Sequence, residues 1–203
     1  MKIIFKDYLD NEIIEEQIAL LDEYSKVFVM PGGVVKKEDF FENNKLQHIH
    51  YYKDIDETEE EARGKLNPYN VPFSIREREK HGDFTIIRVN SYTGNQFTEK
   101  WKFLADANDF ILCTQPINMD SGDFIYEQTT KYLGQYSNDL EPNYCRFNYD
   151  SEGNFTYCAY NYVRDYESEL FELDSLPVIK DKFNLTDETY NYYLTAELLP
   201  RLK

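Results

Sequence analysis

The sequence predicts an α+β fold with a largely antiparallel sheet, and three observations lead to that prediction. Two stretches, 73–90 and 144–164, have the alternation and the turn residues of β-hairpins. Three others, 11–24, 121–136 and 186–199, space their apolar residues as amphipathic helices do. These elements come in mixed order without regular β-α-β alternation, which favours an antiparallel sheet.

The first predicted helix covers about residues 11–24. Ile14, Ile18 and Leu21 recur at the spacing of one helix face. A short strand at the N-terminus precedes this helix, and the apolar segment at 26–30 follows it as a second strand that ends at Pro-Gly-Gly.

The hairpin predicted over 73–90 turns through a three-residue loop, Lys80-His81-Gly82. Gly82 is expected in the left-handed conformation of a bulge, which a residue without a Cβ adopts at no steric cost. This loop length opposes two apolar pairs, Phe73 to Val89 and Ile75 to Ile87.

The hairpin predicted over 144–164 follows the same logic. Asp150 begins a type I turn, and Gly153 takes the bulge position. The resulting register opposes three pairs, Tyr149 to Phe155, Phe147 to Tyr157 and Cys145 to Ala159. In that register Cys145 and Cys158 point to opposite faces, so we expect no disulfide between them.

Two helices are predicted in the second half of the chain. The first begins at Ser121 and continues to about residue 136. The second covers 186–199, with Thr186 as N-cap and acidic residues in its first turn. We predict a single domain over 1–203, with the stretch 64–72 as its best boundary candidate.

Charge is unevenly distributed along this chain, whose formal net charge is −16. Residues 1–64 have 16 acidic and 8 basic side chains, 65–103 have 4 and 7, and 104–203 have 18 and 7. The segments therefore carry −8, +3 and −11. Such a field repels nucleic acids and anionic membranes and attracts basic proteins.

His48 and His50 are the candidate metal ligands. On a strand, strict alternation places them on one face with Leu46, whereas Gln47 points to the other face. Two histidines at i and i+2 can converge on one cation, but a site needs a third protein ligand. A metal-dependent enzyme built on this pair is one alternative.

The chain lacks the glycine fingerprints of nucleotide sites and the serine elbow of hydrolases. We therefore expect a protein that is not an enzyme and has no cofactor. The apolar run near the N-terminus has three residues, too few for a signal peptide, and no stretch reaches the roughly 18 apolar residues of a membrane span. A cytoplasmic location is expected.

The leading functional prediction is an acidic binding protein that neutralises a basic protein, by analogy of class with the immunity proteins of bacterial toxins. Tyrosine gives large contact area at low entropic cost, and carboxylates meet Lys and Arg. A nucleic-acid mimic that inhibits a DNA-binding protein is the alternative within the binding class. The candidate contacts form two acidic strips: Asp54, Asp56, Glu57, Glu59, Glu60 and Glu61, and then Tyr160, Tyr162, Asp165, Tyr166, Glu167 and Glu169.

Overall fold

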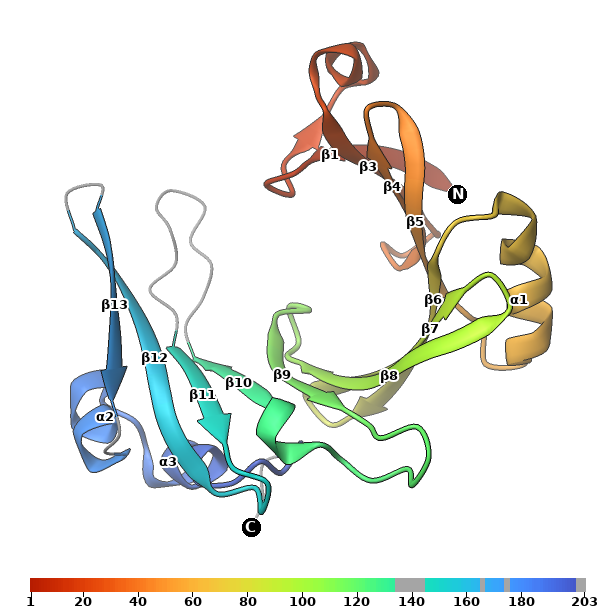
Figure 1. Cartoon of the computed structure of the whole chain (residues 1–203). Helices are drawn as coiled ribbons and strands as arrows, with labels where there is room; N and C mark the ends of the chain where they lie inside the picture. The colour runs from red at the N-terminus through yellow and green to blue at the C-terminus, as the bar shows by residue number, and fades with distance from the viewer. Residues whose placement is uncertain (134–144, 165–166, 174–175, 200–203) are drawn as a thin grey trace. The chain divides into compact units, whose positions relative to one another are not determined.

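The computed structural model describes residues 1–133, 145–164, 167–173 and 176–199, with only the backbone for 160–164 and 167–173. These residues form mostly β-strands and a few short helices, in keeping with the predicted α+β class. The chain divides into two compact units (Figure 1). The first comprises Met1–Arg78 and Arg88–Lys100, and the second comprises Glu79–Ile87 and Trp101–Lys203.

This division does not fall at 64–72, because that stretch belongs to the helical segment of the first unit. Instead, the strands β6, β7 and β8 contribute residues to both units. A single domain over the whole chain stays a prediction.

The sheet of the first unit has the strand order β2-β1-β3-β4-β5-β6, followed by β7 and β8. β5 and β6 are parallel, and the other pairs with a described register in this unit are antiparallel. The strands are β1 (Lys2–Asp7), β2 (Glu12–Ile13), β3 (Glu23–Val29), β4 (Val35–Glu42), β5 (Lys45–Tyr52), β6 (Phe73–His81), β7 (Phe84–Thr93) and β8 (Gln96–Ala105).

Helix α1 (Glu59–Leu66) connects β5 to β6 and packs on one face of this sheet (Figure 1). Thr58 caps it, since its side chain accepts a hydrogen bond from the Glu61 N–H. Leu66 is buried against Ile49 and Phe73, and burying one such side chain contributes about 1.5–3 kcal/mol. The sequence patterns do not predict this helix, because most of its residues are charged and its buried face consists of Ala62 and Leu66 alone.

The predicted helix over 11–24 is wrong. The segment forms β2, the 3-10 helix η1 (Glu15–Leu20) and the start of β3. Of the predicted stripe, Ile14 is 62% exposed and Ile18 and Leu21 are only partly buried, so the stripe does not enter a core. A short helix without packing is marginal in water, whereas β3 gains backbone hydrogen bonds from both β1 and β4.

The hairpin predicted over 73–90 is present as β6 and β7, which are neighbours in the sheet. Gly82 has a φ of +60°, the left-handed conformation expected of it. The turn has two residues instead of three, however, because β6 is longer than predicted. The Phe73 ring stacks on Tyr92 with centroids 5.3 Å apart, whereas the predicted register placed Val89 opposite Phe73.

Among its described residues, the second unit adds five strands and two α-helices. Its core contains buried side chains of β11 and β12 and of α2 and α3, among them Phe147, Ile179 and Tyr193. The Phe147 and Tyr193 rings stack at 4.0 Å. The elements are β9 (Ile111–Pro116), β10 (Thr130–Leu133), β11 (Cys145–Tyr149), β12 (Phe155–Arg164), β13 (Glu167–Leu173), α2 (Leu176–Phe183) and α3 (Asp187–Tyr193).

The helix predicted over 121–136 is also wrong within the described residues. Gly122 has a φ of +79°, which ends any helix that begins at Ser121. Further along are only a 3-10 turn, η3 (Tyr126–Gln128), and then β10, which pairs with β9 and β11. Residues 134–136 lie outside the described residues.

The hairpin predicted over 144–164 is present as β11 and β12. Asp150 holds its turn, because Oδ1 accepts hydrogen bonds from the N–H groups of Glu152 (3.1 Å) and Asn154 (2.8 Å). Gly153 has a φ of +82°, and a Cβ there would lie 3.3 Å from the Tyr126 ring. Both the conformation and the close approach therefore require glycine.

The predicted orientation of two cysteines in this hairpin is wrong. Beyond a register shift at Asn148, Phe147 lies opposite Cys158 instead of Tyr157. Cys145 and Cys158 therefore share one core, and both are buried free thiols. A hydrogen bond with Cys158, together with burial, raises the pKa of Cys145.

The C-terminal helix is shorter than the predicted 186–199. Thr186 is its N-cap as predicted and accepts a hydrogen bond from the Thr189 N–H at 3.2 Å. The helix ends at Tyr193 because the next residues bind the β11–β12 hairpin. The Ala196 N–H donates to the Gly153 carbonyl at 2.8 Å.

Lys131 is a fully buried cation that fixes this C-terminal segment. Its Nζ donates to the backbone carbonyls of Tyr192 (2.5 Å) and Thr195 (2.7 Å). Beside it, the Gln115 amide donates to the Ala196 carbonyl at 2.8 Å. Burial lowers the pKa of Lys131 to about 7.

The stability advantage of the wild type over a Lys131→Met variant is expected to grow as the pH rises from 7 to 9. The folded chain releases a proton that the unfolded chain keeps up to its ordinary pKa of 10.5. The free energy of unfolding should therefore rise by up to about 1.4 kcal/mol per pH unit. Urea unfolding of both proteins at pH 7, 8 and 9 measures the difference, and parallel pH dependences would contradict the prediction.

Candidate binding site: an acidic cavity on the first sheet

The first predicted contact strip, at 54–61, is mostly engaged within the fold. Glu57 is only 9% exposed and lies at the centre of internal contacts. Its carboxylate is 2.6 Å from Lys65 Nζ and 3.5 Å from Lys36 Nζ, and the Tyr51 hydroxyl donates to it at 2.9 Å. Glu57 therefore anchors the segment that leads into α1, and it is not available to a partner.

Three other carboxylates of this stretch are also engaged within the fold. Glu59 accepts hydrogen bonds from two β7 side chains, Glu61 completes the α1 capping box, and Asp54 pairs with a lysine 2.9 Å away. Asp56 and Glu60 are exposed and have no ion pair or hydrogen bond from their side chains to any described residue. The predicted strip is thus reduced to two free carboxylates.

The second predicted strip falls on β12, β13 and the two residues between these strands. Asp165 and Tyr166 lie outside the described residues. The backbone alone is described for the rest, which are Tyr160, Tyr162, Glu167 and Glu169. Their part in binding stays a prediction.

His48 and His50 share one face of β5 as predicted, with ring centroids 4.8 Å apart. An Arg76 nitrogen lies 2.9 Å from His50 Nε2. Because a guanidinium only donates, Nε2 must accept, and His50 is neutral. Burial, Arg76 and His48 together lower the pKa of His50 to about 2.

This arrangement does not suit a metal ion. The His50 nitrogen already accepts a hydrogen bond from a cation, which also repels metal charge. Within the part of the chain that the structure describes, no group of three or more His, Cys, Asp or Glu could hold a metal ion. The metal-dependent enzyme therefore lacks a third ligand among these residues.

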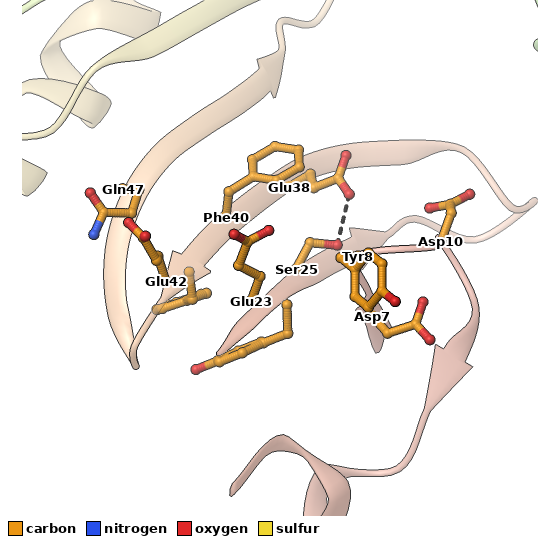
Figure 2. Close-up of a pocket in the computed structure, with 11 residues that line it drawn as sticks. Asp7, Tyr8, Asp10, Glu23, Ser25, Glu38, Phe40, Glu42 and Gln47 are labelled. Carbon is orange, nitrogen blue, oxygen red and sulfur yellow. Dashed lines mark hydrogen bonds between the residues drawn. The ribbon is translucent and has the colours of Figure 1, made fainter. Parts of the chain in front are cut away.

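A cavity of about 460 Å³ opens on the same sheet (Figure 2). Carboxylates and aromatic rings make up most of its wall, and no lysine, arginine or histidine is among its lining residues. The lining comprises Asp7, Tyr8, Asp10, Glu23, Tyr24, Ser25, Glu38, Phe40, Phe41, Glu42 and Gln47.

Cross-strand pairing places the cavity on the face opposite α1. Ser25 pairs with Phe40, and Phe40 pairs with His48, so these three side chains share a face. Their strand neighbours Ile49 and Tyr51 point into the α1 core instead. Helix α1 covers one face, and most of the cavity wall lies on the other. Tyr24 and Phe41 also line the cavity, although their pairing with Leu46 places them on the helix side.

A β-bulge in β5 brings one further side chain to the cavity. Phe40 pairs with His48 but Phe41 pairs with Leu46, which leaves Gln47 as the extra residue. Leu46 consequently packs on the α1 core and Gln47 lines the cavity, the reverse of the predicted alternation. Bulges commonly redirect side chains in this way beside functional sites.

Glu23 and Glu42 form a repulsive pair at the cavity. They lie directly opposite each other on β3 and β4, and both are exposed (Figure 2). Neither has an ion pair with any described residue. Like charges in directly opposed positions destabilise a sheet, so this pair contributes nothing favourable to folding.

The β1–β2 turn forms the rim of the cavity and has a fixed conformation. The Asp7 carboxylate accepts hydrogen bonds from the Asn11 side chain and from the N–H groups of Asn11 and Leu9, which lower the pKa of Asp7. Asp10 pairs with Lys6 at 2.7 Å. The carboxylates of the turn are therefore satisfied, in contrast to those of Glu23 and Glu42.

No protein-family model, no curated protein and no solved structure matches the chain. Among the described residues, no helix has the length and apolar character needed to cross a membrane.

Sequence reasoning missed this site because its acids are far apart in the chain. Glu23, Glu38 and Glu42 belong to two strands, and only the β3–β4 register brings them together. Alternation within "EDFFE" did offer a partial signal, since it places Glu38 and Glu42 on one face of a strand.

A Glu57→Gln variant is expected to lose about 2–3 kcal/mol of stability at pH 7, because it removes the central charge of a buried ion-pair group. Burial alone raises the pKa of Glu57, but Lys65, the Asp54 N–H, Tyr51 and Lys36 outweigh burial and lower the pKa from 4.5 to about 2. The wild-type advantage should therefore shrink as the pH falls from about 4.5 towards 2. Urea unfolding between pH 7 and pH 3 checks this, and a constant difference would refute it.

A Glu42→Gln variant is expected to be more stable than the wild type by about 0.5 kcal/mol at low salt, because it relieves the repulsion with Glu23. Glu60→Gln is the matched control. It removes the same charge from an exposed position in the first turn of α1, where an acid is favourable, so it should be neutral or slightly destabilising. Equal effects of the two substitutions in thermal unfolding would show that only net charge matters.

Proposed function

We propose that the chain binds a basic protein through the acidic cavity of its first unit, and so masks a cationic surface in the manner of a toxin immunity protein. One observation carries this proposal: a cavity of about 460 Å³ is lined by five carboxylates and no basic residue. A positively charged side chain from a partner would supply the missing counter-charge.

The contrast between Glu57 and the pair Glu23 and Glu42 supports this proposal. Glu57 has the cations it needs within the fold. Glu23 and Glu42, in contrast, face each other beside open space without a cation. Natural proteins keep such locally unfavourable arrangements mainly where function requires them.

The charge of the whole chain favours the same kind of partner. A net charge of −16 draws basic proteins in and accelerates their encounter, while the cavity provides a specific place for one cationic group. The strip at Tyr160 to Glu169 is a second proposed contact surface for the same partner.

The test compares two double variants in binding to the basic protein that the wild-type chain captures from its native host. Glu23→Gln/Glu42→Gln removes two charges from the cavity, and Asp56→Asn/Glu60→Gln removes two from the surface near α1. The cavity variant should weaken binding about tenfold and reduce its salt dependence, since each lost charge pair is worth on the order of 1 kcal/mol or less at a partly exposed site. The control should change affinity less than about twofold, as expected for an isolated surface charge.

Equal losses in both variants would mean that only net charge attracts the partner. A loss of affinity confined to the Asp56/Glu60 variant would show that the partner contacts the acidic surface at α1. Either result would overturn the cavity as the binding site.

A further inference from the structure

The shape and chemistry of the cavity also indicate which cationic group fits it. Resting on the proposed function, we propose that the cavity accepts an arginine side chain of the partner, with the guanidinium between Glu23 and Glu42 and an adjacent apolar residue against the Tyr8–Leu9 turn.

The two glutamates suit a planar fork better than a point charge. Directly opposed residues on antiparallel strands have Cβ atoms about 4.5–5.5 Å apart, so one group can reach both carboxylates. A guanidinium presents five N–H donors in a fixed plane, whereas an ammonium is a compact and strongly hydrated charge. Arginine can therefore bond to both carboxylates at once and relieve their repulsion.

The walls of the cavity provide flat aromatic surface for the same group. Phe40 and Tyr8 both line it, and guanidinium planes stack on aromatic rings more readily than ammonium groups do. The first unit already contains this contact, since the Arg78 guanidinium carbon lies 3.8 Å from the centre of the Tyr52 ring.

No basic side chain is among the lining residues, and Lys6 at the rim is already paired with Asp10 at 2.7 Å. Phe40 packs its ring edge-on against the neutral His50, with centroids 4.5 Å apart. Gln47, brought in by the bulge, adds an amide oxygen as a further acceptor for N–H donors.

A separate observation points to an apolar neighbour for the arginine. Tyr8 and Leu9 are 71% and 64% exposed at the tip of the turn that Asp7 fixes at the cavity rim. Large exposed apolar side chains held in a rigid turn are typical of contact surfaces, because they bury area at little entropic cost.

Three blocked pentapeptides test the proposal: acetyl-GLRLG-amide, acetyl-GLKLG-amide and acetyl-GSRSG-amide. Their dissociation constants come from titrations followed by NMR of the labelled chain. The leucine-flanked arginine peptide should bind at least about fivefold more tightly than its lysine twin, and the serine-flanked peptide should be weaker again. Glu42→Gln should remove most of the arginine preference, and Glu60→Gln should leave it unchanged.

Equal or tighter binding of the lysine peptide would overturn the arginine assignment while the acidic cavity remained a binding site. Equal binding of the serine-flanked peptide would overturn the apolar contact at the rim. If no peptide shifts the cavity resonances but the Glu23/Glu42 variant still binds the captured partner more weakly than the wild type does, the arginine inference fails and the proposed function stands. If that variant binds the partner normally as well, both fail.

Discussion

The packing of α1 against β5 and β6 is the interaction on which the first unit depends. Ile49, Leu66 and Phe73 form a buried contact that closes one face of the sheet. Side chains alternate along each strand, so every residue that does not enter this contact must face the other way. The buried helix thereby decides where a polar cavity can form.

Acidic residues of the same type have opposite roles in this unit. Glu57 is enclosed by cations and holds the entry to α1, whereas Glu23 and Glu42 repel each other beside a cavity. These glutamates are equivalent in the amino-acid composition, but Glu57 stabilises the fold whereas the opposed pair does not. The location of the countercharge separates a stabilising acid from one that is available to a ligand.

In the second unit the buried charged residue that organises its surroundings is a lysine, Lys131, whereas in the first unit it is Glu57. Lys131 donates to the carbonyl of Tyr192 in the last turn of α3 and to that of Thr195 just beyond the helix, which lack helical partners where α3 ends. Lys131 also explains why a helix was wrongly predicted over 121–136. It lies on β10, which pairs with β9 and β11, and its ammonium group binds carbonyls of a segment about 60 residues away in the chain. Long-range partners of this kind leave no trace in local periodicity.

The sequence was enough to predict the α+β class, the left-handed conformations of Gly82 and Gly153, and the Thr186 cap, because turn and cap interactions act within a few residues. It also indicated that His48 and His50 share a strand face. Only the tertiary structure decided the register shifts that redirect Gln47 and Cys158, the burial of Glu57 and the opposition of Glu23 and Glu42. Those outcomes depend on which distant strand lies alongside, and alternation within one strand carries no information about its neighbour.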